Sequence, residues 1–576
     1  MKFNVKSVRT GLATLVLLSC NKPVEMDTQV RDYYQDAISL CFVPAGVRWD
    51  FSGGKAPLLE GMDLIDYPVT TSNELARKYF NQGLLLAYAF NHGESERSFQ
   101  YAANLDPTFA MAFWGQAYVL GPNYNAGMEE DYYAPAYSAI QKAKLYINSV
   151  SAKEADLILA MEKRYAEIPP YDRSGLDMAY AEALAELHEK YPDDAEIAVM
   201  YAEALMDLQP WDLYDRQKRP KGNTVLITEI LENTIQQNPK HVGAHHLYMH
   251  VVEPSDNPQR GLPSARLFDE GLTPLAGHLI HMPSHIYIQT GHYNLGTLSN
   301  LRAAKVDSVY IETCKAEGVY PIAYFPHNLH FMAGTAILEG SSKWALYAAD
   351  RLFEHTAKEV MAVPGFGAVQ HYYTIPLFTR VKFGKWEEIL KFPQDVFELP
   401  YQKGVLHYAR GMAFLGKGQL DNAIKELNAL KNHIHLPELE EEKIWDINSL
   451  DSILEIAALV LEGELAAASN DYTKAIQLLE KATELEDSLL FNEPPDWFLS
   501  VRHHLGAVLL EAGDYAKAEE VYLKDLKVYP ENGWALKGLN AALEQQGKSA
   551  EAASVKDRFE EVWKTADISI VSSRID

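Results

Sequence analysis

The feature that most constrains the fold of this chain is a recurring spacing of small, large apolar and proline residues. Gly506 is followed by Ala518, Tyr522 and Pro530 at intervals of 12, 4 and 8 residues, and Ala552 lies 34 residues after Ala518. Related series are Gly463, Ala475, Leu479 and Ala482; Gly411, Ala423, Leu427 and Leu430; and Gly83, Phe99, Ala102 and Pro107. Small residues allow two antiparallel helices to approach closely, and a proline ends the second helix. Such units bury their apolar faces only against neighbouring units, which predicts a stacked array.

This spacing resembles the tetratricopeptide repeat (TPR). The resemblance implies an all-α fold, a right-handed superhelical array of antiparallel helix pairs that is degenerate in the N-terminal half. Between the matching segments, apolar residues recur at the helical period and are separated by turn signals such as Asn238-Pro239 and Gly291-His292. No alternating strand pattern of useful length competes with this interpretation.

The first residues of the chain resemble a targeting segment. Three basic residues lie within the first nine, residues 12–18 are a short apolar run, and Leu-Leu-Ser-Cys follows, ending at Cys20. This order resembles the lipobox of bacterial lipoproteins, in which the cysteine is lipidated and becomes the first residue. The resemblance implies an anchor at Cys20 that tethers the protein to a membrane without spanning it. An ordinary secretory peptide is the alternative.

Asn21 stands where a retention aspartate would hold a lipoprotein at the inner membrane, which favours the outer membrane of a two-membraned cell. The sequence then divides into four predicted regions. Residues 1–20 are the lipoprotein signal peptide, and residues 21–70 are a linker or irregular cap. Residues 71–395 form a degenerate, histidine-rich TPR-like domain, and residues 396–576 form a regular TPR array.

The charge and the cysteines limit the partners and the stabilising chemistry. The formal net charge is −27, which argues against nucleic acid or an anionic lipid surface as a partner because both need a basic surface. Membrane contact is therefore expected through the lipid anchor only. Cys41 and Cys314 remain after processing and permit one disulfide at most, so helix packing must hold the fold.

Histidines are concentrated in one short stretch, where ten of the 19 lie between His241 and His330. They form three groups: His245, His246 and His250 with Glu253; His278, His281 and His285; and His327 and His330. The spacings within the groups place side chains on one face of a helix. In this way a single helix can offer several ligands to one ion.

Repeat phasing predicts that the three groups lie on three consecutive first helices of the pairs. Pro239 ends one second helix, so residues 242–253 form a first helix, and Pro326 starts the first helix of the last group. First helices line the concave face of a TPR array, so the groups should face one groove. Pro283 lies inside the second group, so that helix either kinks or begins there.

These groups predict a divalent metal site, because neutral imidazole is a good ligand for zinc, copper and iron, and a carboxylate beside it suits zinc or non-haem iron. The candidate ligands are His246, His250, Glu253, His278, His281, His285, His327 and His330. One four-coordinate ion needs fewer, so we expect two ions, or one ion with further histidines orienting its ligands. Leu247 stands where the zinc-protease motif has its glutamate, so a protease is not predicted. Histidines packed in helix crossings are the alternative.

Several blocks of the first half occur in the same order in a group of bacterial proteins. They are Phe90-Asn91-His92, Gly121-Pro122-Asn123, Pro210-Trp211-Asp212-Leu213 and the Gly-His-Leu-Ile-His-Met-Pro-Ser-His-Ile-Tyr of residues 277–287. These blocks resemble those of bacterial TPR proteins with a Gly-His-Leu-x-His-Met-Pro-x-His-Ile-Tyr stretch. The resemblance implies an architecture and supplies no activity. The blocks that contain Asn123 and Trp211 also predict aromatic loops that bound a pocket, with packing within the turns as the alternative.

Three functions remain open from the sequence alone. The first is a lipid-anchored envelope protein with a metal site in its groove, acting as a hydrolase or as a copper or iron oxidase. The second is a scaffold whose groove binds a protein or peptide partner without chemistry. The third is a lipoprotein that captures glycans with exposed aromatic side chains. No Gly-rich phosphate loop, Gly-x-Ser-x-Gly elbow or dinucleotide fingerprint occurs in the sequence, so nucleotide cofactors are not expected.

Overall fold

The computed structural model of the protein describes residues 56–59, 64–128, 130–314, 320–497 and 499–575. The predicted signal peptide, the predicted lipidation site Cys20 and Cys41 lie outside the described residues. Within the described residues, no helix is both long and apolar enough to cross a membrane.

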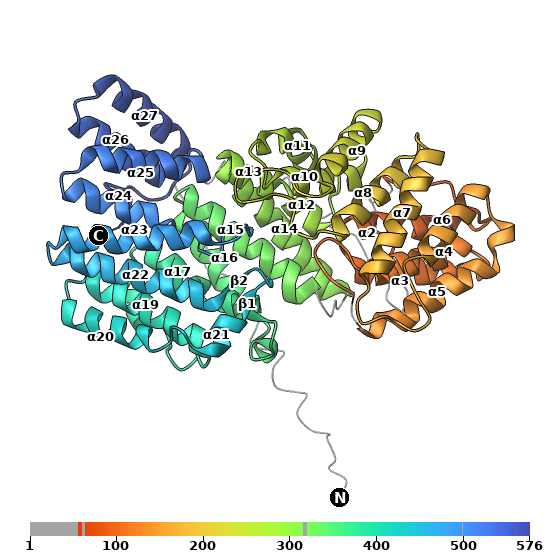
Figure 1. The fold of residues 1–576 in the computed structure, drawn as a ribbon, viewed down its shortest axis with the longest axis horizontal. Helices are drawn as coiled ribbons and strands as arrows, with labels where there is room; N and C mark the ends of the chain where they lie inside the picture. Colours follow the sequence, from red (N-terminus) through yellow and green to blue (C-terminus); the bar gives the residue numbers. More distant parts are fainter. Residues whose placement is uncertain (1–55, 60–63, 129, 315–319, 498, 576) are drawn as a thin grey trace, which may run out of the picture. The chain divides into compact units, whose positions relative to one another are not determined.

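The described residues are built almost entirely of helices (Figure 1), which confirms the predicted all-α array. The helices before the histidine-rich stretch are α2 (Glu74–Tyr88), α3 (His92–Leu105), α4 (Ala110–Leu120), α5 (Tyr133–Leu145), α6 (Ala152–Glu162), α7 (Ser174–Lys190), α8 (Ala195–Asp207) and α9 (Thr224–Gln237). The histidine-rich stretch contains α10 (Val242–Val252), α11 (Leu262–Asp269), α12 (Gly277–His281), α13 (Pro283–Thr290), α14 (Tyr293–Cys314) and α15 (Phe325–Leu338).

The rest of the chain continues the array. Its helices are α16 (Ser342–His355), α17 (Gly367–Lys382), α18 (Trp386–Lys391), α19 (Pro400–Gly416), α20 (Leu420–Lys431), α21 (Pro437–Glu441), α22 (Leu450–Ala468), α23 (Tyr472–Ser488), α24 (Val501–Glu511), α25 (Tyr515–Val528), α26 (Gly533–Gln545) and α27 (Ser549–Val562). The short elements are the 3-10 helices η1 (Glu130–Tyr132), η2 (Ile147–Ser149), η3 (Pro258–Gly261) and η5 (Lys358–Val360), the π-helix η4 (Tyr320–Tyr324), and the strands β1 (Lys443–Ile444) and β2 (Asn448–Ser449). The two strands pair antiparallel, Lys443 with Ser449 and Ile444 with Asn448.

Short polar side chains start many of these helices. The Asn73 side chain accepts hydrogen bonds from the backbone N–H groups at the start of α2, and Asp194 does the same for α8. Ser151 and Glu154 form a reciprocal capping box at the start of α6. These caps satisfy N–H groups that have no partner inside the helix, which is why polar residues recur at the turns between apolar stretches.

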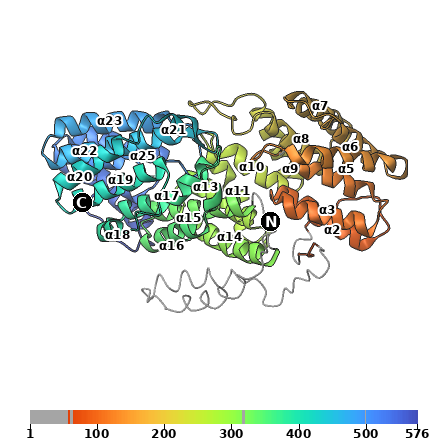
Figure 2. The ribbon, with the colours of Figure 1, turned by 90° about the horizontal axis from the view of Figure 1, so that it is seen from below.

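Helices that follow one another in the sequence pack against each other, as α2 does on α3 and α22 does on α23. In the histidine-rich stretch, α14 contacts α12, α13 and α15, and α10 contacts α13, so the three groups of histidines lie on neighbouring helices. Figure 2 shows α14 next to α15. The helix-pair organisation predicted from the spacing is therefore present in the described chain, with the TPR-like character that the spacing indicated.

Glycines at the repeat positions permit the close helix approach. Gly83 on α2 and Gly115 on α4 lie on either side of the Phe99 ring on α3, at a spacing of 16 residues in both directions. A Cβ atom on Gly83 would lie 2.8 Å from this ring, and one on Gly115 would overlap it. The glycines are therefore required because any larger side chain would push neighbouring helices apart.

The same arrangement recurs near the end of the chain. Gly506 on α24 and Gly538 on α26 flank the Tyr522 ring on α25, again 16 residues away on each side. The two parts of the chain therefore use one packing device, although their histidine contents differ.

Gly115→Ala should lower the free energy of unfolding by roughly 1–3 kcal/mol, because the new methyl group would overlap the Phe99 ring in a filled interior. Chemical denaturation followed by circular dichroism measures the change. Gly175→Ala is the matched control, since a Cβ atom there meets only open space on α7, and it should leave stability unchanged or slightly raised. Equal effects of the two substitutions would contradict the packing role of Gly115.

Candidate metal centre

Four helices bring the predicted ligands together. His246 and His250 lie on α10, which ends at Val252 with Glu253 as its C-cap. Two further helices follow, because Pro283 begins α13 instead of continuing α12. Proline is favoured at this first helical position, since its missing N–H would have no partner there. His281 therefore ends one helix and His285 belongs to the next, as one of the two sequence alternatives predicted.

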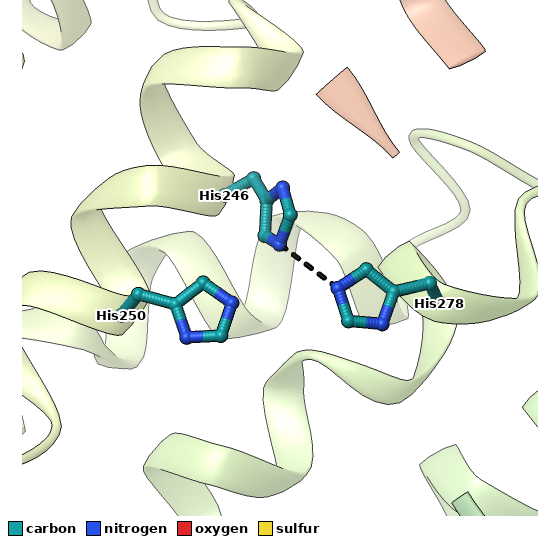
Figure 3. A group of neighbouring side chains, drawn as sticks. All are labelled: His246, His250 and His278. Atoms are coloured by element: carbon teal, nitrogen blue, oxygen red, sulfur yellow. Dashed lines mark hydrogen bonds between the residues drawn. The ribbon is translucent and has the colours of Figure 1, made fainter. Parts of the chain in front are cut away.

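The first triad consists of His246, His250 and His278, and one ring nitrogen of each lies within 4.8 Å of those of the other two. Figure 3 shows the three rings turned toward a shared space between α10 and α12. The Nε2 atoms of His246 and His278 are 3.1 Å apart. An ion bound about 2.0–2.1 Å from two imidazole nitrogens places those nitrogens about 3.0–3.4 Å apart, so this separation fits a shared metal ion.

The second triad consists of His281, His285 and His327, and their ring nitrogens also lie within 4.8 Å of one another. The Nε2 atoms of His281 and His285 are 2.8 Å apart. His327, at the start of α15, completes the triad, with its ring centroid 4.8 Å from that of His281. This triad is thus assembled from α12, the adjoining α13 and the more distant α15.

Glu253 connects the two triads. Its Oε1 lies 3.0 Å from Nδ1 of His250 in the first triad, and its Oε2 lies 2.5 Å from Nδ1 of His285 in the second. All three side chains are buried. Both carboxylate oxygens are therefore directed at ring nitrogens, in the manner of a carboxylate that orients histidine ligands from behind.

Hydrogen bonds fix the ring of His281. Its Nδ1–H donates to Oδ1 of Asn300 at 2.6 Å, and the Asn300 amide donates to the Gly296 carbonyl, which leaves Oδ1 as the acceptor. Nε2 of His281 therefore carries a lone pair. When Glu253 is ionised, Nδ1–H of His285 donates to it, and the two Nε2 lone pairs face each other across 2.8 Å. Such an arrangement repels unless a proton or a cation lies between the two atoms.

The first triad is oriented in the same way. Nδ1–H of His246 donates to the backbone carbonyl of Tyr88 at 2.6 Å, which leaves the Nε2 lone pair for the triad. Within the described residues, Nε2 of His250 is buried without a hydrogen-bond partner. Buried unsatisfied nitrogens are rare and call for an explanation such as a bound ion.

Burial keeps the rings neutral. It lowers the pKa of His250 to about 3, and it lowers the pKa of His281 to about 3 although the hydrogen bond from this ring to Asn300 partly opposes the shift. Neutral rings retain a lone pair at pH 7, which is the form that binds a metal ion. Burial also raises the pKa of the Glu253 carboxyl well above its usual range, so a nearby cation would stabilise its ionised form.

One phenylalanine packs on each triad. The Phe90 ring lies with its centroid 4.6 Å from His246 and 5.5 Å from His278 of the first triad, and also contacts His250. Phe331 lies 4.5–5.2 Å from the three rings of the second triad. These apolar rings exclude water from the sides of the triads and hold the imidazoles in place.

A cavity of about 230 Å³ gives access to both triads. Its walls include histidines of each triad, the two aromatic loops predicted from the sequence, and residues of the C-terminal part: Asn125, Ala126, Trp211, His250, His278, His285, Ala323, Tyr324, His327, Gly365, Trp445, Asp446, Ile447, Asn492 and Glu493. The volume suits a small molecule or the end of a side chain rather than a folded partner.

Backbone strain is concentrated around this cavity. Eight non-glycine residues in the described chain have positive φ, and four of them contact a triad or line the cavity: Phe90, Trp211, Trp445 and Asp446. Each left-handed conformation costs roughly 1–2 kcal/mol for a residue with a side chain. Such strain persists when the surrounding structure enforces it, and it is typical of functional sites.

Glu493 places a second buried carboxyl at the cavity. Its Oε1 accepts a hydrogen bond from the side chain of Gln289 on α13, while Oε2 has no hydrogen-bond partner among the described residues. Burial raises the pKa of this carboxyl well above its usual range, and the nearby Glu253 adds to the effect. No sequence pattern indicated Glu493, because it lies outside any helix, in a segment without periodicity.

Not every predicted ligand joins the triads. His330 on α15 lies against the rings of His371 and Tyr372. It belongs to none of the described groups of converging ligands. His245 is a structural histidine, since Ser264 and the Pro239 carbonyl lie at its two ring nitrogens. Phe331 and Asn300 were missed by the sequence, because neither residue type is itself a sign of metal binding.

Comparisons with known proteins leave the family open. No protein-family model matches the chain, and no curated protein sequence matches it. A human IFIT1 dimer with m7Gppp-AAAA aligns with 86% of this chain and 92% of its own at 11% identity and a TM-score of 0.31. Yeast Tom70 aligns with 84% and 92% at 14% identity and 0.29, and the P58(IPK) TPR domain with 84% and 92% at 12% identity and 0.20. TM-scores of this size carry no argument, so the TPR-like description rests on the helix pairing and spacing above.

Proposed function

We propose that this protein is a lipid-anchored envelope metalloenzyme that holds two divalent ions in adjacent three-histidine sites and hydrolyses a small substrate. The first triad would hold one ion and the second triad the other, with Glu253 orienting a ligand of each. When bound, such ions polarise a carbonyl or phosphoryl group and activate water. The substrate would enter the cavity that both triads line.

The observation that carries this proposal is the convergence of three ring nitrogens in each triad, all within 4.8 Å of one another, with Nε2 of His246 and Nε2 of His278 at the 3.1 Å separation that fits a shared ion. A histidine that only packs a helix crossing uses its ring nitrogens on carbonyls and hydroxyls, as His245 does. The triad histidines instead direct nitrogens at one another in a buried space. That geometry favours a cation between them over packing alone.

Glu493 favours hydrolysis among the metal-assisted reactions. Its carboxyl lines the cavity and accepts a hydrogen bond from Gln289 through one oxygen, while the other oxygen has no hydrogen-bond partner among the described residues. A buried carboxyl with a raised pKa is suited to accept a proton from an attacking water and return it to a leaving group. The chain thus supplies its own proton acceptor beside the two sites.

A copper oxidase is the second candidate, because every nitrogen ligand in the two triads is a neutral imidazole. Two monovalent copper ions would balance the charges of ionised Glu253 and Glu493, whereas two divalent ions would leave an excess of positive charge in a buried space. Imidazole is a suitable ligand for both zinc and copper, so the metal that copurifies distinguishes the two candidates.

The chain lacking residues 1–20, purified without chelators, should contain about two zinc ions per molecule. His246→Ala/His250→Ala should remove one ion and His281→Ala/His285→Ala the other, because each pair belongs to a different triad. Inductively coupled plasma mass spectrometry measures the ratio of metal to protein, and circular dichroism checks that each variant is folded.

His330→Ala is the matched control, since this histidine shares α15 with His327 but contacts His371 instead of the triads, and it should keep both ions. Copper in place of zinc would favour the oxidase over the hydrolase. Near-zero metal in the wild type and in both double variants would refute the metal sites. A scaffold that binds a protein or peptide partner, or a glycan-capture protein, would then remain.

Glu253→Gln should weaken metal binding about 10–100-fold while leaving two ions bound at saturation, because an amide cannot accept from both Nδ1–H groups. Competition with a chromophoric chelator measures the affinity. Glu339→Gln provides the comparison, since Glu339 is also buried on the same array but accepts from Asn294 rather than from a histidine. If the two variants bound metal equally well, Glu253 would not orient the ligands.

The proposed envelope location depends on Cys20 and can be tested apart from the metal. Cys20→Ala expressed in a two-membraned bacterium should move the protein from the outer-membrane fraction to the soluble periplasmic fraction, because the lipid is its anchor. Fractionation and immunoblotting give the distribution. Retention of the Cys20→Ala variant in the membrane fraction would disprove the lipid anchor.

A further inference from the structure

The wall of the cavity beside the triads carries acidic side chains and no basic ones. Its described lining residues include two carboxyl groups, Asp446 and Glu493, and neither lysine nor arginine. The charge of Lys218 acts on Glu493, but the Lys218 ammonium group donates to the Ser255 carbonyl at 3.3 Å, and this lysine does not line the cavity. A ligand that enters the cavity therefore meets negative charge that no lining side chain neutralises.

Apart from the histidines, two polar side chains of the lining are buried with an acceptor atom that has no partner. These atoms are Oδ1 of Asn125 and, when the carboxyl is ionised, Oε2 of Glu493. Buried acceptors of this kind call for donors from a ligand or from water. A positively charged ligand would also favour the ionised form of Glu493, whose pKa burial raises.

Trp445 and Asp446 form the tip of the hairpin between β1 and β2, and both line the cavity. They have positive φ angles of 51° and 59°. Trp445 is 41% exposed and Asp446 is exposed as well, whereas His250 and His278 of the same lining are buried. The hairpin therefore places an indole and a carboxylate at the solvent side of the cavity, with the triads at its inner side.

An indole next to a carboxylate is a combination that binds a protonated amine. An ammonium group supplies three donors and a positive charge and has no acceptor. It is attracted to the carboxylate and also to the face of a tryptophan ring within about 6 Å. Trp211 adds a second indole to the same cavity, where it stacks on Tyr124 with ring centroids 5.0 Å apart. A neutral hydroxyl group would satisfy fewer of these interactions.

The same wall disfavours a phosphate ester as the substrate. Proteins hold the charged oxygens of a phosphate group with arginine or lysine side chains, and the described lining has neither. The carbonyl group of an amide is neutral, so it needs no additional cation from the wall. A cavity of about 230 Å³ also limits the ligand to a small molecule, such as the amide of a single amino acid.

We propose that the substrate of this centre is a small amide that carries a protonated amine, and that Asp446 and Trp445 select it by binding that amine. This inference rests on the proposed hydrolysis at the two triads. The water oxygen bonds to the carbonyl carbon, and the carbon–nitrogen bond breaks. One water proton passes through Glu493 to the leaving nitrogen, and the other hydrogen stays with the new carboxyl group.

The test compares two amides of the same size on the full chain loaded with zinc. They are alanine p-nitroanilide and the p-nitroanilide of lactic acid, in which a hydroxyl group replaces the ammonium group. The value of kcat/KM should be at least about tenfold higher for the alanine compound, mainly through a lower KM. Asp446→Asn should remove most of this preference without loss of metal. Asp395→Asn is the matched control, since Asp395 is exposed but does not line the cavity, and it should keep the preference.

Binding without reaction separates this inference from the proposed hydrolysis. At pH 6, where benzylamine is protonated, isothermal titration calorimetry should show that it binds the wild type at least about tenfold more tightly than benzyl alcohol does, and Asp446→Asn should lose the difference. If neither amide were hydrolysed but this difference in binding were found, the hydrolase would be wrong and the amine site would stand. Equal hydrolysis of the two amides with equal binding of amine and alcohol, or preferential hydrolysis of p-nitrophenyl phosphate, would overturn the inference.

Discussion

The candidate centre depends on the contacts of the buried Glu253 carboxyl group with two histidine rings. A buried carboxyl group needs hydrogen-bond partners, and here the partners are Nδ1 of His250 and Nδ1 of His285. Because Glu253 ends α10 and His285 lies on α13, this one side chain ties two helices together and determines how both rings turn. The nitrogens left over belong to different triads, so one carboxylate sets the orientation of both.

The surroundings of the triads add rigidity in two ways. Phe90 and Phe331 each pack on three imidazoles, so a shift of any ring would have to displace an aromatic neighbour. The left-handed backbone of Trp211, Trp445 and Asp446 brings loops over the cavity at a cost that the rest of the array must offset. The strained loops and the tightly packed rings therefore preorganise the site for its ligands.

The two parts of the chain use the same contact between helices and carry different polar groups. Gly83, Phe99 and Gly115 form the same close contact as Gly506, Tyr522 and Gly538. On that shared frame the N-terminal part carries the triads, and the C-terminal part carries the carboxylates that hold Arg574. The hairpin loop with Trp445 also reaches the cavity of the triads, so the C-terminal part contributes to that site as well.

The sequence by itself determined the helices, their pairing and the positions of the histidine groups, because all of these depend on local periodicity and on where small residues and prolines occur. It also predicted a break at Pro283, since proline at a helix start is a local rule. Only the tertiary structure decided that His330 turns toward His371 and that Glu253 lies behind two rings. It alone placed Glu493 at the cavity and Arg574 beside Glu464. These features follow from side-chain rotation and from contacts between residues far apart in the chain, which spacing along one sequence does not encode.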